Sequence, residues 1–214
     1  RGLKRFAADY AGKVLPPACA ASTGKKIAII GGGPGGLSAA YYLQLMGHQT
    51  TVFEMLPKLG GMLRYGIPNY RLPKERLDDD IDAILETGVK VEYGKRIGTD
   101  ITIQELRKEY DAVLITIGAS TDKKLGIEGE SAEGVISAVR FLRDVGKNLN
   151  PDLTGQEVAV IGGGNVSMDA VRTARRLGAK KVSILYRRRV ADMTALPSEI
   201  EGAVAEGIEV KTLM

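Results

Sequence analysis

The chain has few of the residues that build metal sites and disulfide frameworks. Its 214 residues include one cysteine, Cys19, one histidine and no tryptophan. A single cysteine cannot form a disulfide within the chain or the Cys-x-x-Cys pair of a dithiol reductase, and with one histidine it falls short of a His/Cys metal site. The sequence therefore predicts no metal site in this chain, and its composition fits a reducing cytoplasm.

Long apolar runs and a strong charge of one sign are also missing. No apolar run approaches the roughly 18 residues of a membrane helix, and no signal peptide is visible. The net charge of +4 is too small to argue for a nucleic acid partner. With 44% hydrophobic and 26% charged residues, the composition is that of an ordinary globular chain. We expect one or two domains that bind neither a membrane nor a nucleic acid.

The clearest motif that is present is a glycine turn between a strand and a helix. Ile27–Ile30 is an apolar, β-branched-rich run typical of a strand buried on both faces, and a helical stretch follows at Leu37–Met46. Between them stand Gly31, Gly33 and Gly36 in the pattern Gly-x-Gly-x-x-Gly. The first glycine permits the tight turn, the second lets the backbone approach a pyrophosphate, and the third lets the helix pack on the strand. Free N–H groups at the helix start favour negative charge there.

A carboxylate stands where a dinucleotide ribose would lie. A second apolar run, Thr50–Phe53, is followed by Glu54, 18 positions past Gly36. This spacing suits hydrogen bonds to ribose hydroxyl groups. We therefore predict that residues 25–54 form a βαβ unit that binds a dinucleotide, the alternative being a glycine-rich turn that binds nothing.

The next segment, LPKLGGMLRYGIPNYRLPK at 56–74, is unusually long for a connection in an α/β pattern. Loops of this length are functional or disordered, and the apolar and tyrosine residues argue against disorder. We interpret it as a loop that wraps a large ligand. Arg64 and Arg71 would then contact a phosphate or a ring carbonyl; the alternative for each is a solvated surface charge.

Alternating helix and strand patterns continue to residue 155. We expect an amphipathic helix at 74–87 with a solvated acidic face, a strand from Val89, and a short helix at 102–110. Asp111–Ile117 should be another buried strand that ends at Gly118, where backbone would come close to a ligand. Residues 119–134 are polar and glycine-rich and mark a boundary, with a helix at 135–145 and a connector after it.

The opening motif then returns 131 positions later. The stretch VAVIGGGNVSMDAV from Val158 matches Gly31 with Gly162 and Gly33 with Gly164. Ser167 replaces the third glycine and is still small enough for close packing. A repeated strand, turn and helix argue for nucleotide binding more strongly than one copy does.

The two units differ at the end of the second strand. The second unit ends Lys181–Tyr186 with Arg187, Arg188 and Arg189, and Arg187 lies 20 positions past Ser167, where an NAD-preferring site would carry a carboxylate. Arginine forks suit a ribose 2′-phosphate through bidentate hydrogen bonds. The first site therefore suits the ribose diol of FAD and the second suits NADP, the alternative being a solvated basic turn.

A last helix and strand complete the predicted pattern. Ser198 is the expected N-cap of a helix at 199–206, and residues 208–213 look like the third strand of the second unit. A doubly wound half needs further strands, so we expect the second domain to be incomplete at its C-terminus.

A family resemblance rests on six motifs, which are, in chain order, GGGPGGL, FE, LGGMLRYGIPNYRLPK, VLITIGA, VIGGGNVSMDA and YRRR. The chain resembles flavoproteins with two dinucleotide-binding domains. The branch is that of the glutamate synthase small subunit, the amino-terminal half of dihydropyrimidine dehydrogenase and the flavoprotein subunit of NADH-dependent ferredoxin:NADP oxidoreductase. The resemblance implies an α/β fold with two Rossmann-like domains, the second inserted in the first.

This resemblance divides the chain into four parts. They are an amino-terminal helix and linker at 1–24, the first part of an FAD-binding domain at 25–134, a connector at 135–155 and an incomplete NAD(P)H-binding domain at 156–214.

The resemblance also implies cofactor-binding residues, but no catalytic residue, because the cofactors carry the chemistry. For FAD they are Gly31, Gly33, Pro34, Gly35, Glu54, Gly61, Met62, Arg71 and Gly118. For NADP(H) or NAD(H) they are Gly163, Gly164, Asn165, Val166, Arg187, Arg188 and Thr194.

The implied function is an NAD(P)H-dependent FAD oxidoreductase subunit. Hydride would pass from NAD(P)H to FAD, and electrons would leave to iron–sulfur clusters in other domains or partner subunits, with a ferredoxin-linked complex among the candidates. Because the chain starts at Arg1 and lacks the family's cluster-binding cysteines, we expect it to be part of a longer subunit. The alternative is a truncated or degenerate nucleotide-binding module that scaffolds a complex without turnover. A self-contained amine or disulfide oxidoreductase is disfavoured because the thiol pair is missing.

Overall fold

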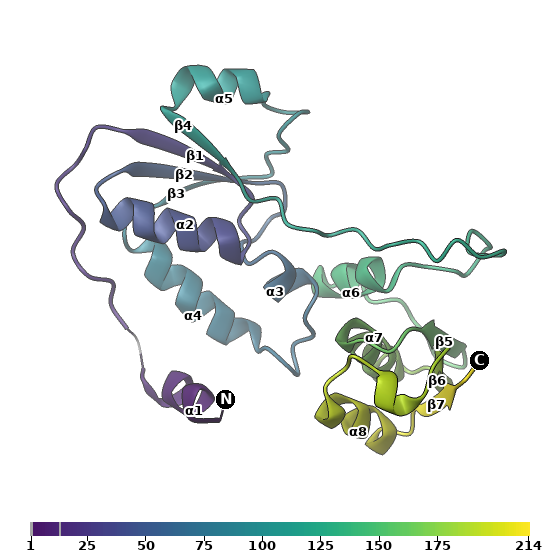
Figure 1. The fold of residues 1–214 in the computed structure, drawn as a ribbon. Coiled ribbons are helices and arrows are strands. Elements are labelled where there is room, and N and C mark those ends of the chain that lie inside the picture. The colour runs from purple at the N-terminus through teal and green to yellow at the C-terminus, as the bar shows by residue number, and fades with distance from the viewer. Residues whose placement is uncertain (1, 13) are drawn as a thin grey trace. The chain divides into compact units, whose positions relative to one another are not determined.

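The computed structural model describes residues 2–12 and 14–214, which divide into two compact units. The first unit runs to Arg64 and continues at Leu72–Ala119. The second comprises Tyr65–Arg71 and Ser120–Met214, so that a seven-residue segment from the long loop belongs to it. Both units carry parallel sheets with helices, which confirms the predicted α/β class (Figure 1).

The first unit is built on a four-stranded parallel sheet with the order β3-β2-β1-β4. Its strands are β1 (Lys26–Ile30), β2 (Gln49–Glu54), β3 (Lys90–Tyr93) and β4 (Ala112–Ile115). Its helices are α1 (Gly2–Tyr10), α2 (Pro34–Leu45), α4 (Lys74–Leu85) and α5 (Ile103–Glu109), and α3 (Met62–Tyr65) ends in the segment that belongs to the second unit.

Alternate residues of β1 face different helices. Ile29 packs into a core with residues of α2 and α4, whereas Ala28 and Ile30 face a smaller core that includes Leu106 of α5. Figure 1 shows α2 and α4 on one side of the sheet and α5 on the other. The chain changes sides between β1 and β4, and ligands of doubly wound sheets bind at such a switch point, outside the carboxyl ends of the strands.

The expected burial of the strand at 111–117 is wrong. In β4 and just after it, Leu114, Ile115 and Ile117 are exposed, Ile117 to 69%. The reason is that β4 pairs only with β1 and forms the edge of the sheet, so described residues cover it incompletely. The first strand, by contrast, is central and buried as predicted.

The second unit has a three-stranded parallel sheet, β5-β6-β7. Its elements are α6 (Ala138–Gly146), β5 (Glu157–Ile161), α7 (Asn165–Arg176), β6 (Lys181–Tyr186), the short 3-10 helix η1 (Val190–Asp192), α8 (Pro197–Ala205) and β7 (Glu209–Thr212). The core joins Met168 and Val171 of α7 to Ile184 of β6. Val158 and Val160 of β5 point toward this core, while Ile161 is exposed.

Two helix starts differ from the sequence prediction. The helix expected from Leu37 begins at Pro34, because a proline is well tolerated in a first turn. Ser198 is not an N-cap: α8 starts at Pro197, and the Asn165 side chain accepts a hydrogen bond from the N–H of Leu196 instead (3.0 Å). The helix therefore starts without a side-chain cap, and the long-range bond from Asn165 holds the residue just before it.

No helix in residues 2–12 and 14–214 has the length and apolarity to cross a membrane. The same residues bring no three His, Cys, Asp or Glu side chains together as a metal site would require.

Candidate dinucleotide-binding sites

The first glycine turn lies where β1 and β4 diverge. Gly31 has a φ of +107°, and a Cβ at this position would lie 2.5 Å from the carbonyl oxygen of Thr116, just after β4. A Cβ at Gly36 would lie 1.9 Å from the carbonyl oxygen of Gly31. Both positions thus require glycine for the protein's own packing, which confirms the tight turn and the close helix approach predicted for them.

Gly33 and Gly35 have no such internal reason to be glycine. Gly33 has ordinary angles (φ −79°, ψ −177°), and its added Cβ would meet nothing described closer than Gly61 Cα at 3.7 Å. A Cβ at Gly35 would lie 4.0 Å from the Thr116 Cβ. The turn therefore leaves space beside its backbone for a group that is not part of the chain. Because α2 starts without a side-chain cap, an anionic group such as a pyrophosphate fits there.

The Glu54 carboxylate forms a hydrogen bond with this turn. It is 6% exposed and accepts hydrogen bonds from the N–H groups of Gly32 and Leu56, both at 2.8 Å. Gly61 lies against Gly33 of the turn, since a Cβ on Gly61 would come within 2.7 Å of Gly33 Cα. The structure thus brings Glu54 and Gly61 to the glycine turn, and their predicted contact with FAD stays a prediction.

Other residues predicted for the FAD side lie around the same turn or after β4. Met62, at the start of α3, is 36% exposed. Gly118 follows β4 with a φ of +68°, a conformation that favours glycine. Their contact with a cofactor stays a prediction.

Arg64 is neither a solvated charge nor an open ligand contact. Its side chain is 5–6% exposed, its Nε donates to the carbonyl oxygen of Leu59, and its Nη2 pairs with Asp78 of α4. The solvated alternative for Arg64 was therefore wrong, because its side chain is buried and two of its three nitrogens have partners within the protein. The sequence did not suggest this, since Asp78 belongs to an acidic run expected to face solvent.

The second glycine turn repeats the packing of the first. Gly162 has a φ of +143°, and a Cβ there would lie 2.5 Å from the Ser167 hydroxyl. Gly163 lies against the Tyr186 ring, since a Cβ on Gly163 would lie 2.7 Å from the Cε2 of that ring. Gly164, the counterpart of Gly33, is open: its Cβ would meet only the Thr194 hydroxyl, at 3.5 Å. The α7 helix also starts without a side-chain cap, so this turn too can take an anionic group.

The loop after β6 folds back over this second turn. The Ala195 N–H donates to the Gly163 carbonyl oxygen (3.0 Å), and the Tyr186 hydroxyl donates to the Asp192 carbonyl oxygen (2.8 Å). Asn165 holds Leu196, as described above. The loop brings Thr194 beside Gly164, while Val166 remains 46% exposed in the first turn of α7.

The three arginines after β6 are not equivalent. Arg189 pairs with the Asp192 carboxylate (3.1 Å). Arg187 and Arg188 are exposed, and within the described residues their guanidinium groups form no hydrogen bond or ion pair. Two cations at the end of the second strand are therefore available to a ligand, at the position where the dinucleotide pattern places the ribose.

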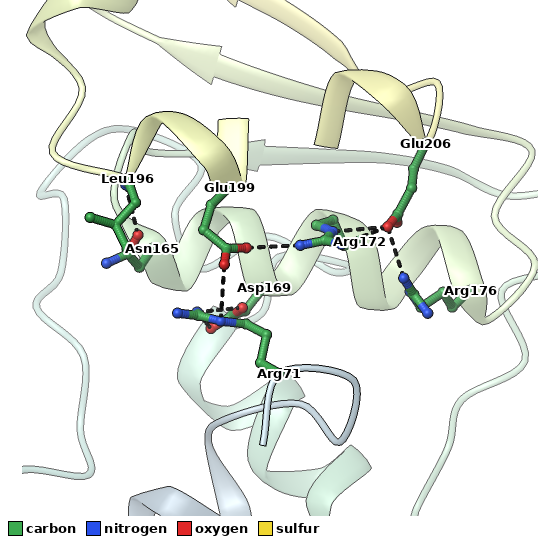
Figure 2. A network of polar contacts seen from close by, with 8 residues as sticks. All are labelled: Arg71, Asn165, Asp169, Arg172, Arg176, Leu196, Glu199 and Glu206. Atoms are coloured by element: carbon green, nitrogen blue, oxygen red, sulfur yellow. Dashed lines mark hydrogen bonds and ion pairs between the residues drawn. The ribbon is translucent and has the colours of Figure 1, made fainter. Parts of the chain in front are cut away.

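Arg71 takes part in a polar network of the second unit (Figure 2). Its Nη1 lies 2.8 Å from both carboxylate oxygens of Asp169, and its Nε lies 3.3 Å from Glu199. Arg172 bridges Glu199 and Glu206, at 2.8 Å each. Two of the three nitrogens of Arg71 are thus engaged within the protein, and its contact with FAD stays a prediction.

Tyr70 lies beneath this network. Its ring centroid is 4.6 Å from the Arg172 guanidinium carbon and 4.1 Å from that of Arg176, which also pairs with Glu206. Burial raises the pKa of the Tyr70 hydroxyl to about 12. Burial likewise raises the pKa of Asp169, against the hydrogen bonds from Arg71. This network was not predicted from the sequence, in which only the spacing of Asp169, Arg172 and Arg176 along one helix face points to it.

Comparison with known proteins agrees with this geometry. Residues 25–212 match the family described as pyridine nucleotide-disulphide oxidoreductase. The chain belongs to this family. The chain is similar to "NADP(+)-dependent formate dehydrogenase subunit beta" of Moorella thermoacetica, which is 44% identical over 97% of this chain and 33% of its own length. "Glutamate synthase [NADPH] small chain" of Escherichia coli is 37% identical over 88% of this chain and 42% of its own length. The resemblance to the glutamate synthase small subunit is thus confirmed.

A solved structure gives the same fold. "Mycobacterium tuberculosis FprA in complex with NADPH" matches with a TM-score of 0.71 and 26% identity, over 85% of this chain and 47% of that protein. The chain spans about a third to a half of these relatives.

Proposed function

We propose that this chain is the nucleotide-binding part of a flavoprotein oxidoreductase subunit. FAD binds at the first glycine turn and NADP(H) at the second, and hydride passes from NADPH to FAD. The observation that carries the proposal is the pair of open glycines, Gly33 and Gly164, each in a turn that faces an uncapped helix start. Family membership and the NADPH complex of the relative FprA support it.

The two sites are distinguished by charge. The first offers the Glu54 carboxylate, an acceptor for ribose hydroxyl groups. The second offers Arg187 and Arg188, which suit a 2′-phosphate. When bound, FAD supplies the capacity to accept hydride and release electrons one at a time. The chain's own residues bind and orient the two nucleotides, and no side chain needs to transfer a proton.

The acceptor of the electrons lies outside this chain in the proposal. Iron–sulfur clusters in further domains or partner subunits, including a ferredoxin-linked complex in the cytoplasm, would receive them. Relatives described as beta subunits or small chains of oxidoreductases support the existence of partner subunits. A nucleotide-binding module that scaffolds such a complex without turnover is the competing function, since it would use the same fold.

The visible spectrum of the purified protein tests the proposal. After reconstitution with FAD, the protein should retain the absorption of oxidised flavin through gel filtration, and NADPH should bleach it under anaerobic conditions. Retained flavin that NADPH fails to bleach would favour the scaffold. A protein that retains no flavin and binds no NADPH would contradict both nucleotide sites.

A further inference from the structure

We propose that Arg64 is a positioning residue for the first dinucleotide site: it fixes Leu59 and Gly60 against the glycine turn. A buried guanidinium is costly unless it is paired. The Arg64 Nε donates to the Leu59 carbonyl oxygen, and its Nη2 pairs with the Asp78 carboxylate of α4. It therefore joins the segment before α3 to a rigid helix, and it acts on a ligand through this segment rather than by touching it.

The segment that Arg64 holds is in turn bonded to the glycine turn. The Gly60 N–H donates to the Gly32 carbonyl oxygen at 2.8 Å. On the other side of the same residue, the Gly32 N–H donates to Glu54 at 2.8 Å. Both polar backbone groups of Gly32 are thus held, one by the carboxylate after β2 and the other by the segment that Arg64 anchors.

Packing makes this arrangement specific. Leu59 is 2% exposed, and a Cβ on Gly32 would lie 2.3 Å from its Cδ2. Gly60 has a φ of +116°, and a Cβ there would collide with Leu77 (2.9 Å) and crowd the Arg64 side chain (3.1 Å). A side chain at Gly32 or Gly60 would push the segment and the turn apart. Their contact therefore requires glycine at both positions.

The neighbouring residues are those that face the open space. Gly33 follows Gly32 directly, and Gly61, next to Gly60, lies against Gly33. If Arg64 is lost, the Gly60–Gly32 bond loses its anchor and Gly33 can move. Ordering of the turn would then fall to the ligand, and affinity would drop by that cost. The inference rests on the proposed function only in taking FAD as this ligand.

The test compares Arg64→Met with Arg76→Met in protein freed of flavin. Arg76 lies on α4, where its side chain is 52% exposed, pairs with Asp79 and donates to the Asp9 carbonyl oxygen. Hydrogen exchange should accelerate in Arg64→Met at residues 31–36 and 59–61 and remain unchanged in Arg76→Met. Titration of FAD by flavin fluorescence should show about tenfold weaker binding for Arg64→Met, from the loss of hydrogen bonds made by a charged donor. NADP⁺ binding should remain unchanged, since the second turn lies in the other unit.

The outcomes separate the inference from the proposed function. If wild type binds no FAD, the proposed function fails, while the exchange experiment still decides whether Arg64 orders the turn. Unchanged exchange and unchanged FAD affinity in Arg64→Met would overturn the inference. Should Arg64→Met fail to fold, Asp78→Asn removes the ion pair but keeps the Leu59 bond. It should then give the same local acceleration of exchange to a smaller extent, and wild-type exchange in a folded Asp78→Asn protein would count against the inference.

Discussion

The terminal nitrogen Nη1 of Arg71 lies 2.8 Å from each carboxylate oxygen of Asp169, a residue 98 positions away. Asp169 is buried in α7, whereas Arg71 comes from the long loop between α3 and α4. This pair, with Glu199 and the ring of Tyr70, explains why Tyr65–Arg71 belongs to the second unit.

Replacing Asp169 with alanine should destabilise the second unit. The substitution leaves the half-buried Arg71 with Glu199 alone, and breaking a buried ion pair costs about 3 kcal/mol. The free energy of unfolding, followed by circular dichroism in urea, measures the effect. Asp192→Ala is the matched control, since its partner Arg189 is 74% exposed and such pairs contribute about 1 kcal/mol or less. Equal losses in the two variants would contradict the assigned role of Asp169.

Tyr70→Phe should leave stability at neutral pH unchanged or raise it. The Tyr70 hydroxyl is buried and, among the described residues, has no hydrogen-bond partner. Removing a buried unsatisfied group relieves a cost of about 1 kcal/mol or more, and the ring still packs under the two arginines. Thermal unfolding at pH 7 measures this, and a clear loss of stability would show that the hydroxyl has a partner.

The same variant changes stability in alkali. Burial raises the pKa of Tyr70 to about 12 in the folded chain, against about 10 when unfolded. Between these values the unfolded chain binds fewer protons, so wild-type stability should fall as the pH rises from about 10 to about 12. Tyr70→Phe should lack this part of the fall. Ultraviolet titration of tyrosinate, in which Tyr70 ionises late, provides an independent measurement.

The double substitution of Arg187 and Arg188 by alanine should weaken the binding of NADPH much more than that of NADH. Hydrogen bonds to charged groups contribute about 1.5–3 kcal/mol each, so NADPH binding should weaken about 100-fold, with little change for NADH. Calorimetric titration of each nucleotide measures both affinities. Lys180→Ala controls for net charge, because Lys180 is an exposed cation just before β6, at the opposite end of that strand. Equal losses for both nucleotides would argue against a 2′-phosphate contact.

Glu54→Gln should weaken FAD retention. The carboxylate accepts bonds from Gly32 and Leu56 with its two oxygens, and an amide can keep only one of them. We expect roughly tenfold weaker binding from the loss of one such bond. Glu92→Gln, on the exposed strand β3, is the control. Retention of flavin through gel filtration equal to that of wild type would show that the turn and the ribose do not depend on this charge.

The local pattern of the chain predicted most elements and the two glycine turns. Ile27–Ile30 and Thr50–Phe53 are rich in β-branched residues and largely buried because both faces of their strands are covered, and Gly31 and Gly36 are required by packing that any such unit shares. Local periodicity cannot show that β4 lies at the edge, because its apolar run resembles that of a central strand.

Long-range partners were the part that the sequence could not supply. Arg64 and Asp78 each look like surface charges until the fold brings them together, and Arg71 meets Asp169 across 98 positions. The residue just before α8, Leu196, is held in the same way by Asn165, which accepts its N–H from 31 positions away. Charged residues carry no periodic signal of their partners, so such pairs emerge only from the three-dimensional structure.

The membership of Tyr65–Arg71 in the second unit has a consequence for dissecting the protein. A fragment cut at the apparent boundary, residues 120–214, would leave Asp169 without its arginine and uncover the surfaces of Arg172 and Arg176 that now pack on Tyr70. Such a fragment is a continuous stretch of chain, but it lacks the ion pair of Asp169 and the aromatic ring that packs on Arg172 and Arg176. A synthetic peptide spanning residues 65–71 would be the natural complement for restoring these contacts, and fusing that peptide to the fragment is a route to a second unit that can be studied by itself.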